Sequence, residues 1–100
     1  MSKLEKEEET KIRNWCKKNN VLFIKFTPMG EKGWMDRIVI LPNGKHIWME
    51  LKRNGKAPTR LQYHRMKTLY DYNVVALWFD SAEEAIEFLQ EELSYAIQTS

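Results

Sequence analysis

The sequence predicts an α/β fold with a mixed four-stranded sheet flanked by helices, in the order α-β-β-β-α-β-α. Apolar residues recur at helical spacing in three segments, and short strand-like runs bounded by turn residues lie between them. Residues 74–79 are almost continuously apolar, as expected of a strand covered on both faces. With 100 residues, 43% of them hydrophobic, we expect one domain over 1–100 with one modest core.

The first half of the chain is predicted to form a helix followed by three strands. Ile12, Trp15 and Cys16 fall on one stripe of a helix over 4–19, which Asn19 and Asn20 end. Proline and glycine mark the loop after the first strand, and Pro42-Asn43-Gly44 separates the second strand from the third. The predicted strands are 21–26, 35–41 and 45–52, with the loop at 27–33.

The second half is predicted to contain a helix, a strand and a last helix. An Asn-Gly pair and a proline mark a loop at 54–58, and a helix over 59–71 follows it. After the strand at 74–79, Ser81-Ala82-Glu83-Glu84 fits a capping box. This box predicts the start of a helix that continues to about residue 97.

Composition excludes several classes of protein. The single cysteine, Cys16, allows no internal disulfide, and together with two histidines it lacks the spacing of a structural zinc site. The apolar runs are too short to cross a membrane, and the charged start of the chain does not resemble a signal peptide. We therefore expect no membrane partner and a cytoplasmic location, in the host cell if the protein is viral.

Charge is distributed unevenly although the net charge is only +2. Residues 5–9 and 80–92 are acidic, whereas residues 52–67 contain no acid. That basic block permits nucleic acid as a partner. Its basic residues are Lys52, Arg53, Lys56, Arg60, Arg65 and Lys67, with His64 among them.

The turn between the second and third strands sets the register of a hairpin. Three loop residues suit a type I turn closed by Gly44 at positive φ. Counting outward from this turn, Asp36 lies opposite Glu50, about 5 Å apart at Cβ, and Lys52 points to the same face. A two-residue loop would instead put the two acids on opposite faces.

Two facing carboxylates repel each other unless a cation lies between them. Mg²⁺ or Mn²⁺ prefers carboxylate, carbonyl and water oxygens, and a neighbouring lysine orients water or neutralises charge on a phosphate. Asp36, Glu50 and Lys52 therefore fit metal-dependent phosphodiester hydrolysis. The plain alternative is an exposed strand edge with ordinary charged residues.

These residues resemble the PD-(D/E)xK nuclease superfamily, and more narrowly the virus-type replication–repair nuclease (VRR-NUC) domain. The resemblance covers nearly the whole chain, and it implies the restriction-endonuclease-like core. One departure is Met35, where the family often has a proline before the aspartate. The motifs that carry it are Gly33-Trp34-Met35-Asp36-Arg37, Glu50-Leu51-Lys52 and Gln62.

The resemblance implies roles for individual residues. Asp36 and Glu50 would be metal ligands with the Leu51 carbonyl, and Lys52 would be the catalytic lysine. A further ligand would come from the first helix, where Glu9 and Glu5 both qualify and acids near a helix N-terminus also have a structural explanation.

Gln62 has two interpretations. It would be the family's functional glutamine, or it would close a capping box with Thr59. Arg53, Lys56, Arg60 and His64 are expected to contact the DNA backbone. Tyr63 and Trp34 would stack on bases or belong to the packing. We expect His46 to pack or to face solvent rather than to bind a metal.

The expected function is a metal-dependent DNA endonuclease. The resemblance implies branched or flapped DNA as substrate, such as a four-way junction, and a homodimer. One alternative is a nucleic-acid-binding module without catalysis, in which the acids are structural. Another is a protein-interaction domain that uses the acidic last helix.

Overall fold

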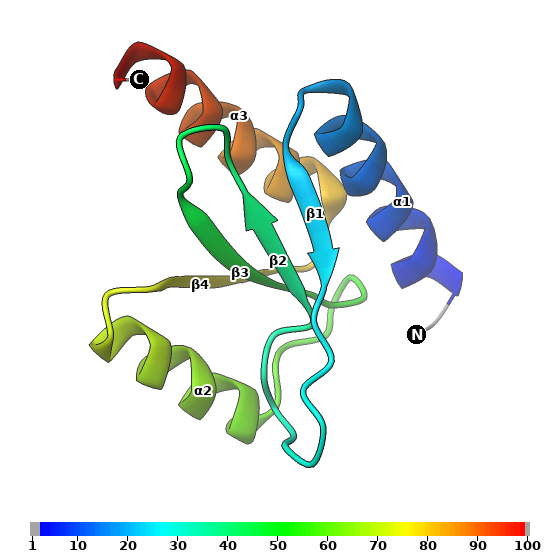
Figure 1. Ribbon diagram of the computed structural model, residues 1–100. Helices are drawn as coiled ribbons and strands as arrows, with labels where there is room; N and C mark the ends of the chain where they lie inside the picture. The colour runs from blue at the N-terminus through cyan, green and yellow to red at the C-terminus, as the bar shows by residue number, and fades with distance from the viewer. Residues whose placement is uncertain (1–2, 100) are drawn as a thin grey trace.

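The structure, a computed structural model, describes residues 3–99 of the chain. Seven elements follow one another in the predicted order (Figure 1). Each predicted helix and strand is present, and its ends differ from the prediction by at most a few residues. The elements are α1 (Lys3–Lys18), β1 (Leu22–Lys25), β2 (Arg37–Ile40), β3 (His46–Leu51), α2 (Arg60–Asp71), β4 (Val75–Phe79) and α3 (Ala82–Thr99).

The four strands form one mixed sheet in the order β1-β2-β3-β4. β1 pairs with β2 and β2 with β3 in antiparallel fashion, whereas β4 pairs with β3 in parallel. The parallel pair needs a crossover, and α2 supplies it. The predicted fold class is therefore confirmed, a mixed four-stranded sheet flanked by helices.

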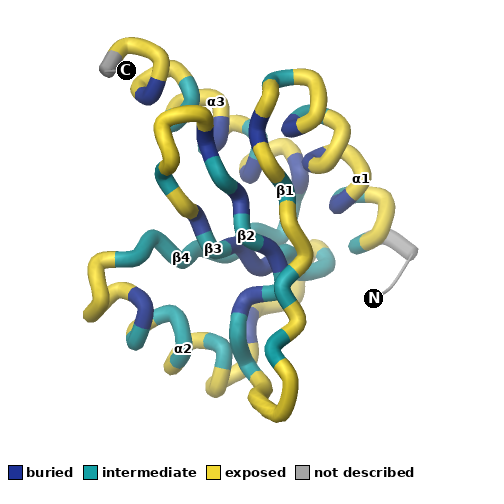
Figure 2. The backbone as a smooth tube through the Cα atoms, in the orientation of Figure 1, coloured by how far each residue is buried: buried dark blue, intermediate teal, exposed yellow. Residues whose placement is uncertain are grey.

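The helices lie on both sides of this sheet. α1 and α3 pack against each other and cover one face, while α2 lies beside β4 on the other side (Figure 1). Buried positions gather where α1 and α3 meet β2 and β3 (Figure 2). Ile12 and Cys16 of α1 meet Val39 and Ile47 of the sheet in this core. The core fixes the strands whose ends carry the candidate site.

Side chains alternate between the two faces of β2 and β3. Val39 and Met49 are buried against α1 and α3, so Ile38 and Trp48 point to the side of α2. The two helices that flank the later loops start as predicted, because Thr59 caps α2 and the Ser81 hydroxyl accepts from the Glu84 amide at 3.1 Å. Within residues 3–99, no helix is long and apolar enough to cross a membrane.

Candidate active site

The turn between β2 and β3 has the predicted three-residue form. The Leu41 amide donates to the Lys45 carbonyl at 3.0 Å, and the Gly44 amide donates to the Leu41 carbonyl at 2.8 Å. Gly44 has φ of 87°, which a residue with a side chain rarely adopts. Ile40 therefore pairs with His46, and Ile38 with Trp48, as counted from the sequence.

This register brings Asp36, Glu50 and Lys52 to one face of the sheet. The last paired residues at this end are Arg37 and Met49, so the next step places Asp36 opposite Glu50. Asp36 is held by its carbonyl, which accepts from the Phe26 amide at 2.9 Å. Lys52 extends the parallel ladder by donating from its amide to the Phe79 carbonyl at 2.8 Å.

The side chains of the site are close, and those of Glu50 and Lys52 are largely withdrawn from water, whereas that of Asp36 is 41% exposed. The Lys52 Nζ lies 3.7 Å from Glu50 Oε2, and the two side chains are only 20% and 8% exposed. The Asp36 Oδ2 lies 3.7 Å from Arg37 Nη1. Asp36 and Glu50 therefore lie in a partly buried site, where Lys52 and Arg37 are the nearby cations.

Burial raises the pKa of the Glu50 carboxyl to about 7, and the neighbouring Asp36 charge adds to the rise. Lys52 opposes the shift. Burial also raises the pKa of Asp36, against the lowering effect of Arg37. In the metal-free protein the charged form of both carboxyl groups is therefore disfavoured.

The donor set fits a hard divalent cation. The Glu50 Oε1 is buried and has no hydrogen-bond partner, which costs free energy that a cation would recover. Mg²⁺ commonly uses one or two protein carboxylates and fills its remaining positions with water and phosphate oxygens. Among the described residues, no group of three or more acids, histidines or cysteines is arranged to hold a metal, so a cation here would rely on Asp36 and Glu50.

Glu9 of α1 lies near the site but is already engaged. Its Oε1 accepts from Arg37 Nε at 2.8 Å, from Arg37 Nη2, and from Arg13 Nη2 at 2.8 Å. Its charge raises the pKa of Asp36, which shows that the two carboxylates are near each other. Glu5 lies a turn earlier in α1 and is half-buried. A ligand role for either glutamate stays a prediction.

Arg37 contacts the candidate site, and the sequence alone assigned it no role of its own. It is buried, and besides binding Glu9 it donates from Nη1 to the Asp36 carbonyl at 2.8 Å. The signal available in the sequence was its place directly after Asp36, which turns it to the opposite face of β2, toward α1. Arg37 thus connects the first helix to the backbone of Asp36.

Gln62 closes the capping box of α2. Its Oε1 accepts from the Thr59 amide at 2.9 Å, and its own amide donates to Thr59 Oγ1 at 3.1 Å. The capping interpretation is therefore confirmed. The side-chain nitrogen takes no part in this box, so a second role for Gln62 stays a prediction.

The predicted DNA contacts follow Lys52 along the loop and the start of α2. Lys56, Arg60 and His64 are exposed, and Arg53 is half-buried. Trp34 belongs to the packing, because its ring lies 6.2 Å from that of Trp48. Tyr63 and His46 are exposed, as a stacking residue or a solvent-facing residue would be.

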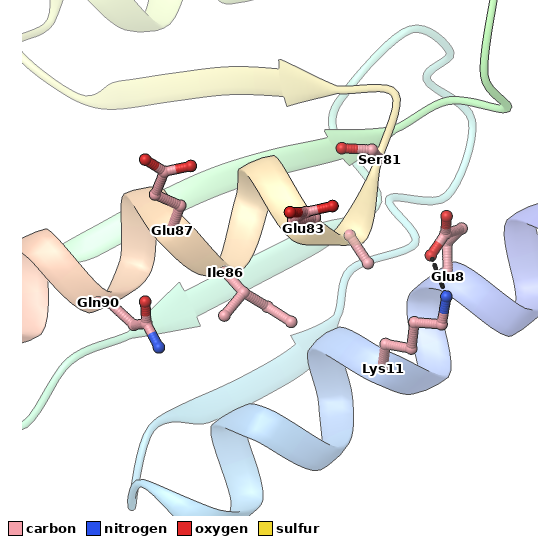
Figure 3. A pocket seen from close by; sticks show the side chains of 8 residues that line it. Glu8, Lys11, Ser81, Glu83, Ile86, Glu87 and Gln90 are labelled. Carbon is pink, nitrogen blue, oxygen red and sulfur yellow. Dashed lines mark ion pairs between the residues drawn. The ribbon is translucent and has the colours of Figure 1, made fainter.

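A groove of about 660 Å³ lies between α1 and the start of α3 (Figure 3). Glu8 forms an ion pair there with Lys11 at 3.2 Å. The groove contains more acids than bases, which disfavours a phosphate. Its lining residues include Glu8, Lys11, Ser81, Glu83, Ile86, Glu87 and Gln90.

The fold of this chain is similar to that of a solved protein structure. A solved structure described as "VRR_NUC domain" superimposes with a TM-score of 0.81, over 89% of this chain and 97% of that one, at 18% sequence identity. The chain has the VRR-NUC fold. The predicted fold family is thus confirmed at the level of structure.

Two further comparisons concern the sequence. No protein-family model matches it. "Putative nuclease p44" of Acyrthosiphon pisum secondary endosymbiont phage 1 is 37% identical to it over 59 residues. That match spans 59% of this chain and 63% of the relative's length. The chain therefore spans less than two thirds of the length of this relative.

Proposed function

We propose that this VRR-NUC chain is one nuclease domain over residues 1–100, a metal-dependent DNA endonuclease that hydrolyses phosphodiester bonds. The observation that carries the proposal is the convergence of Asp36, Glu50 and Lys52 on one face, with a Glu50 oxygen buried and unpaired. A purely structural pair of acids would leave that oxygen uncompensated. The phage relative named as a nuclease supports the same class of activity.

Asp36, Glu50 and the Leu51 carbonyl would hold Mg²⁺ or Mn²⁺. When bound there, such a cation supplies Lewis-acid polarisation of the scissile phosphate. Lys52, whose Nζ is beside Glu50, is placed to orient or deprotonate the attacking water and to neutralise charge that develops on the phosphate. Arg37 keeps the Asp36 backbone in place from the opposite face.

The DNA backbone would be held by the basic residues after Lys52. In the first turn of α2 the Gln62 amide is used by the cap, and the amides of Arg60 and Leu61 would favour a phosphate. These contacts give affinity without reading sequence, so selectivity would come from DNA structure. We therefore propose branched or flapped DNA, such as a four-way junction, as the substrate. The contact residues proposed are Arg53, Lys56, Arg60 and His64, with Gln62 at the helix start.

A homodimer is part of the proposal. Leu22 and Ile24 lie on the edge strand β1 and are 57% and 43% exposed, an apolar face that a second copy would cover. Light scattering at tens of micromolar tests this, because the 12.0 kDa chain should give twice that mass. A species of the monomer mass alone would refute the pairing. We place the protein in the cytoplasm, where DNA of a phage or its host is accessible.

The activity is tested by nicking of a labelled four-way junction with Mn²⁺. Lys52→Ala should lose at least about a hundredfold in rate, as expected when a general acid–base group is removed. Lys18→Ala is the matched control, because Lys18 is an exposed lysine in the last turn of α1, outside the basic block at 52–67. Cutting by pure Lys52→Ala protein at the wild-type rate would remove the mechanism. Binding without cutting by the wild type would favour a non-catalytic module.

A further inference from the structure

The loop between β1 and β2 is fixed against α2. A Cβ added to Gly33 would overlap Leu61 Cγ and lie 2.8 Å from Leu61 Cδ2, so the loop backbone passes directly over that side chain. Arg65 donates from Nε to the Lys32 carbonyl at 3.1 Å, and its guanidinium lies 4.5 Å from the centre of the Trp34 ring. Because the same loop ends at Asp36, its position relative to the candidate site is set.

The tip of this loop carries an apolar side chain with almost no cover. Met29 is 96% exposed, and it lies between Pro28 and Gly30, whose φ is 78°. In Figure 1 the loop extends beyond the sheet beside the first turn of α2. The loop, held against α2 at residues 32–34, thus presents a methionine on the side where the predicted DNA contacts begin.

Two lysines and one acid lie in or beside this loop, a formal charge of +1 that suits a polyanion. Lys25 and Lys32 at the two ends of the loop are exposed, and neither forms an ion pair within the described part of the chain. Glu31, the acid of the loop, accepts from Trp34 Nε1 at 3.0 Å. An apolar tip flanked by unpaired lysines matches proteins that insert an apolar residue between base steps.

We propose that Met29 is a wedge that enters the base stack at the branch point of a branched DNA and so determines specificity for it. The inference rests on the proposed nuclease function and names the residue that selects the substrate. Separating stacked bases in a continuous duplex costs a few kcal/mol per step, and the cost is least where pairing or stacking is already disturbed. Met29 would therefore favour a branch point over continuous duplex.

The test compares Met29→Gln, which keeps the length of the side chain but makes it polar, with Met29→Leu, which keeps it apolar. The ratio of cutting rates for a flapped or four-way substrate over linear duplex should fall about tenfold in Met29→Gln, the equivalent of ~1.4 kcal/mol, and be largely kept in Met29→Leu. Tyr70→Gln is the control, since Tyr70 is also exposed but lies in the last turn of α2.

A direct readout places 2-aminopurine at the branch point and uses the Lys52→Ala background to prevent cutting. Binding should raise its fluorescence when residue 29 is Met or Leu, and the rise should be absent with Gln. A full rise and an unchanged rate ratio in Met29→Gln would overturn the wedge while the nuclease function stands. A wild type that cuts no DNA would overturn the proposed function, and the wedge with it.

Discussion

Arg37 of β2 and Glu9 of α1 form a buried ion pair directly behind Asp36. Arg37 binds Glu9 through Nε and Nη2 and uses Nη1 for the Asp36 carbonyl. Arg13 completes the group by binding the same Glu9 oxygen from the solvent side. The pair therefore couples the packing of α1 to the position of the first candidate metal ligand.

Removing one member of this pair should destabilise the protein strongly. Glu9→Ala leaves the Arg37 guanidinium buried without its anion, which typically costs about 3–5 kcal/mol. Glu87→Ala, which removes an exposed glutamate from α3, should stay within about 0.5 kcal/mol of the wild type. Urea unfolding measures both. Equal stability of the two variants would show that the buried pair is unimportant.

The raised pKa of Glu50 predicts a pH dependence in the metal-free protein. The carboxyl has a pKa of about 7 when folded and 4.5 without its surroundings, so the folded state keeps a proton that the unfolded chain has lost. The resulting stability is fully present below pH 4.5 and is lost as the pH rises through 7. The change is at most about 3 kcal/mol, and Asp36 adds to it in the same direction.

Unfolding by urea from pH 5 to pH 8 measures this dependence. Glu50→Gln should flatten most of it, and so should Mn²⁺, because a bound cation holds the carboxylate in its charged form. A wild type without metal that is as stable at pH 8 as at pH 5, relative to Glu50→Gln, would contradict the assigned protonation of Glu50.

The contact between the β1–β2 loop and α2 predicts different effects at two glycines. Gly30 and Gly33 both have positive φ, but only Gly33 has a neighbour within 4 Å of an added Cβ. Gly30→Ala should cost about 1–2 kcal/mol from backbone strain alone. Gly33→Ala should cost about 1–3 kcal/mol more, because Leu61 must move. Equal losses in thermal or urea unfolding would mean that the loop is not fixed against α2.

The hairpin register was predictable from the sequence because its causes are local. Pro42-Asn43-Gly44 determines the loop length, and the alternation of side chains along a strand then assigns Asp36 and Glu50 to one face. The Thr59–Gln62 capping box was equally local. The structure confirms this box, in which Gln62 Oε1 accepts from the Thr59 amide.

The contacts between distant segments were not predictable in this way. Glu9 and Arg37 are far apart in the chain, and several acids of α1 satisfy the same helical spacing. Only the packing of α1 on the sheet selects Glu9 as the partner of Arg37. The same holds for Arg65 and Trp34, whose stacking depends on how the loop folds back over α2.

The most direct measurement of the central claim is a calorimetric titration with Mn²⁺. The wild type should bind the cation, and Asp36→Ala and Glu50→Ala should each lose at least about tenfold in affinity, since each removes a ligand. Asp71→Ala, which removes an exposed acid of α2, should bind as the wild type does. Binding by Asp36→Ala that is as tight as that of the wild type would contradict a metal site between Asp36 and Glu50.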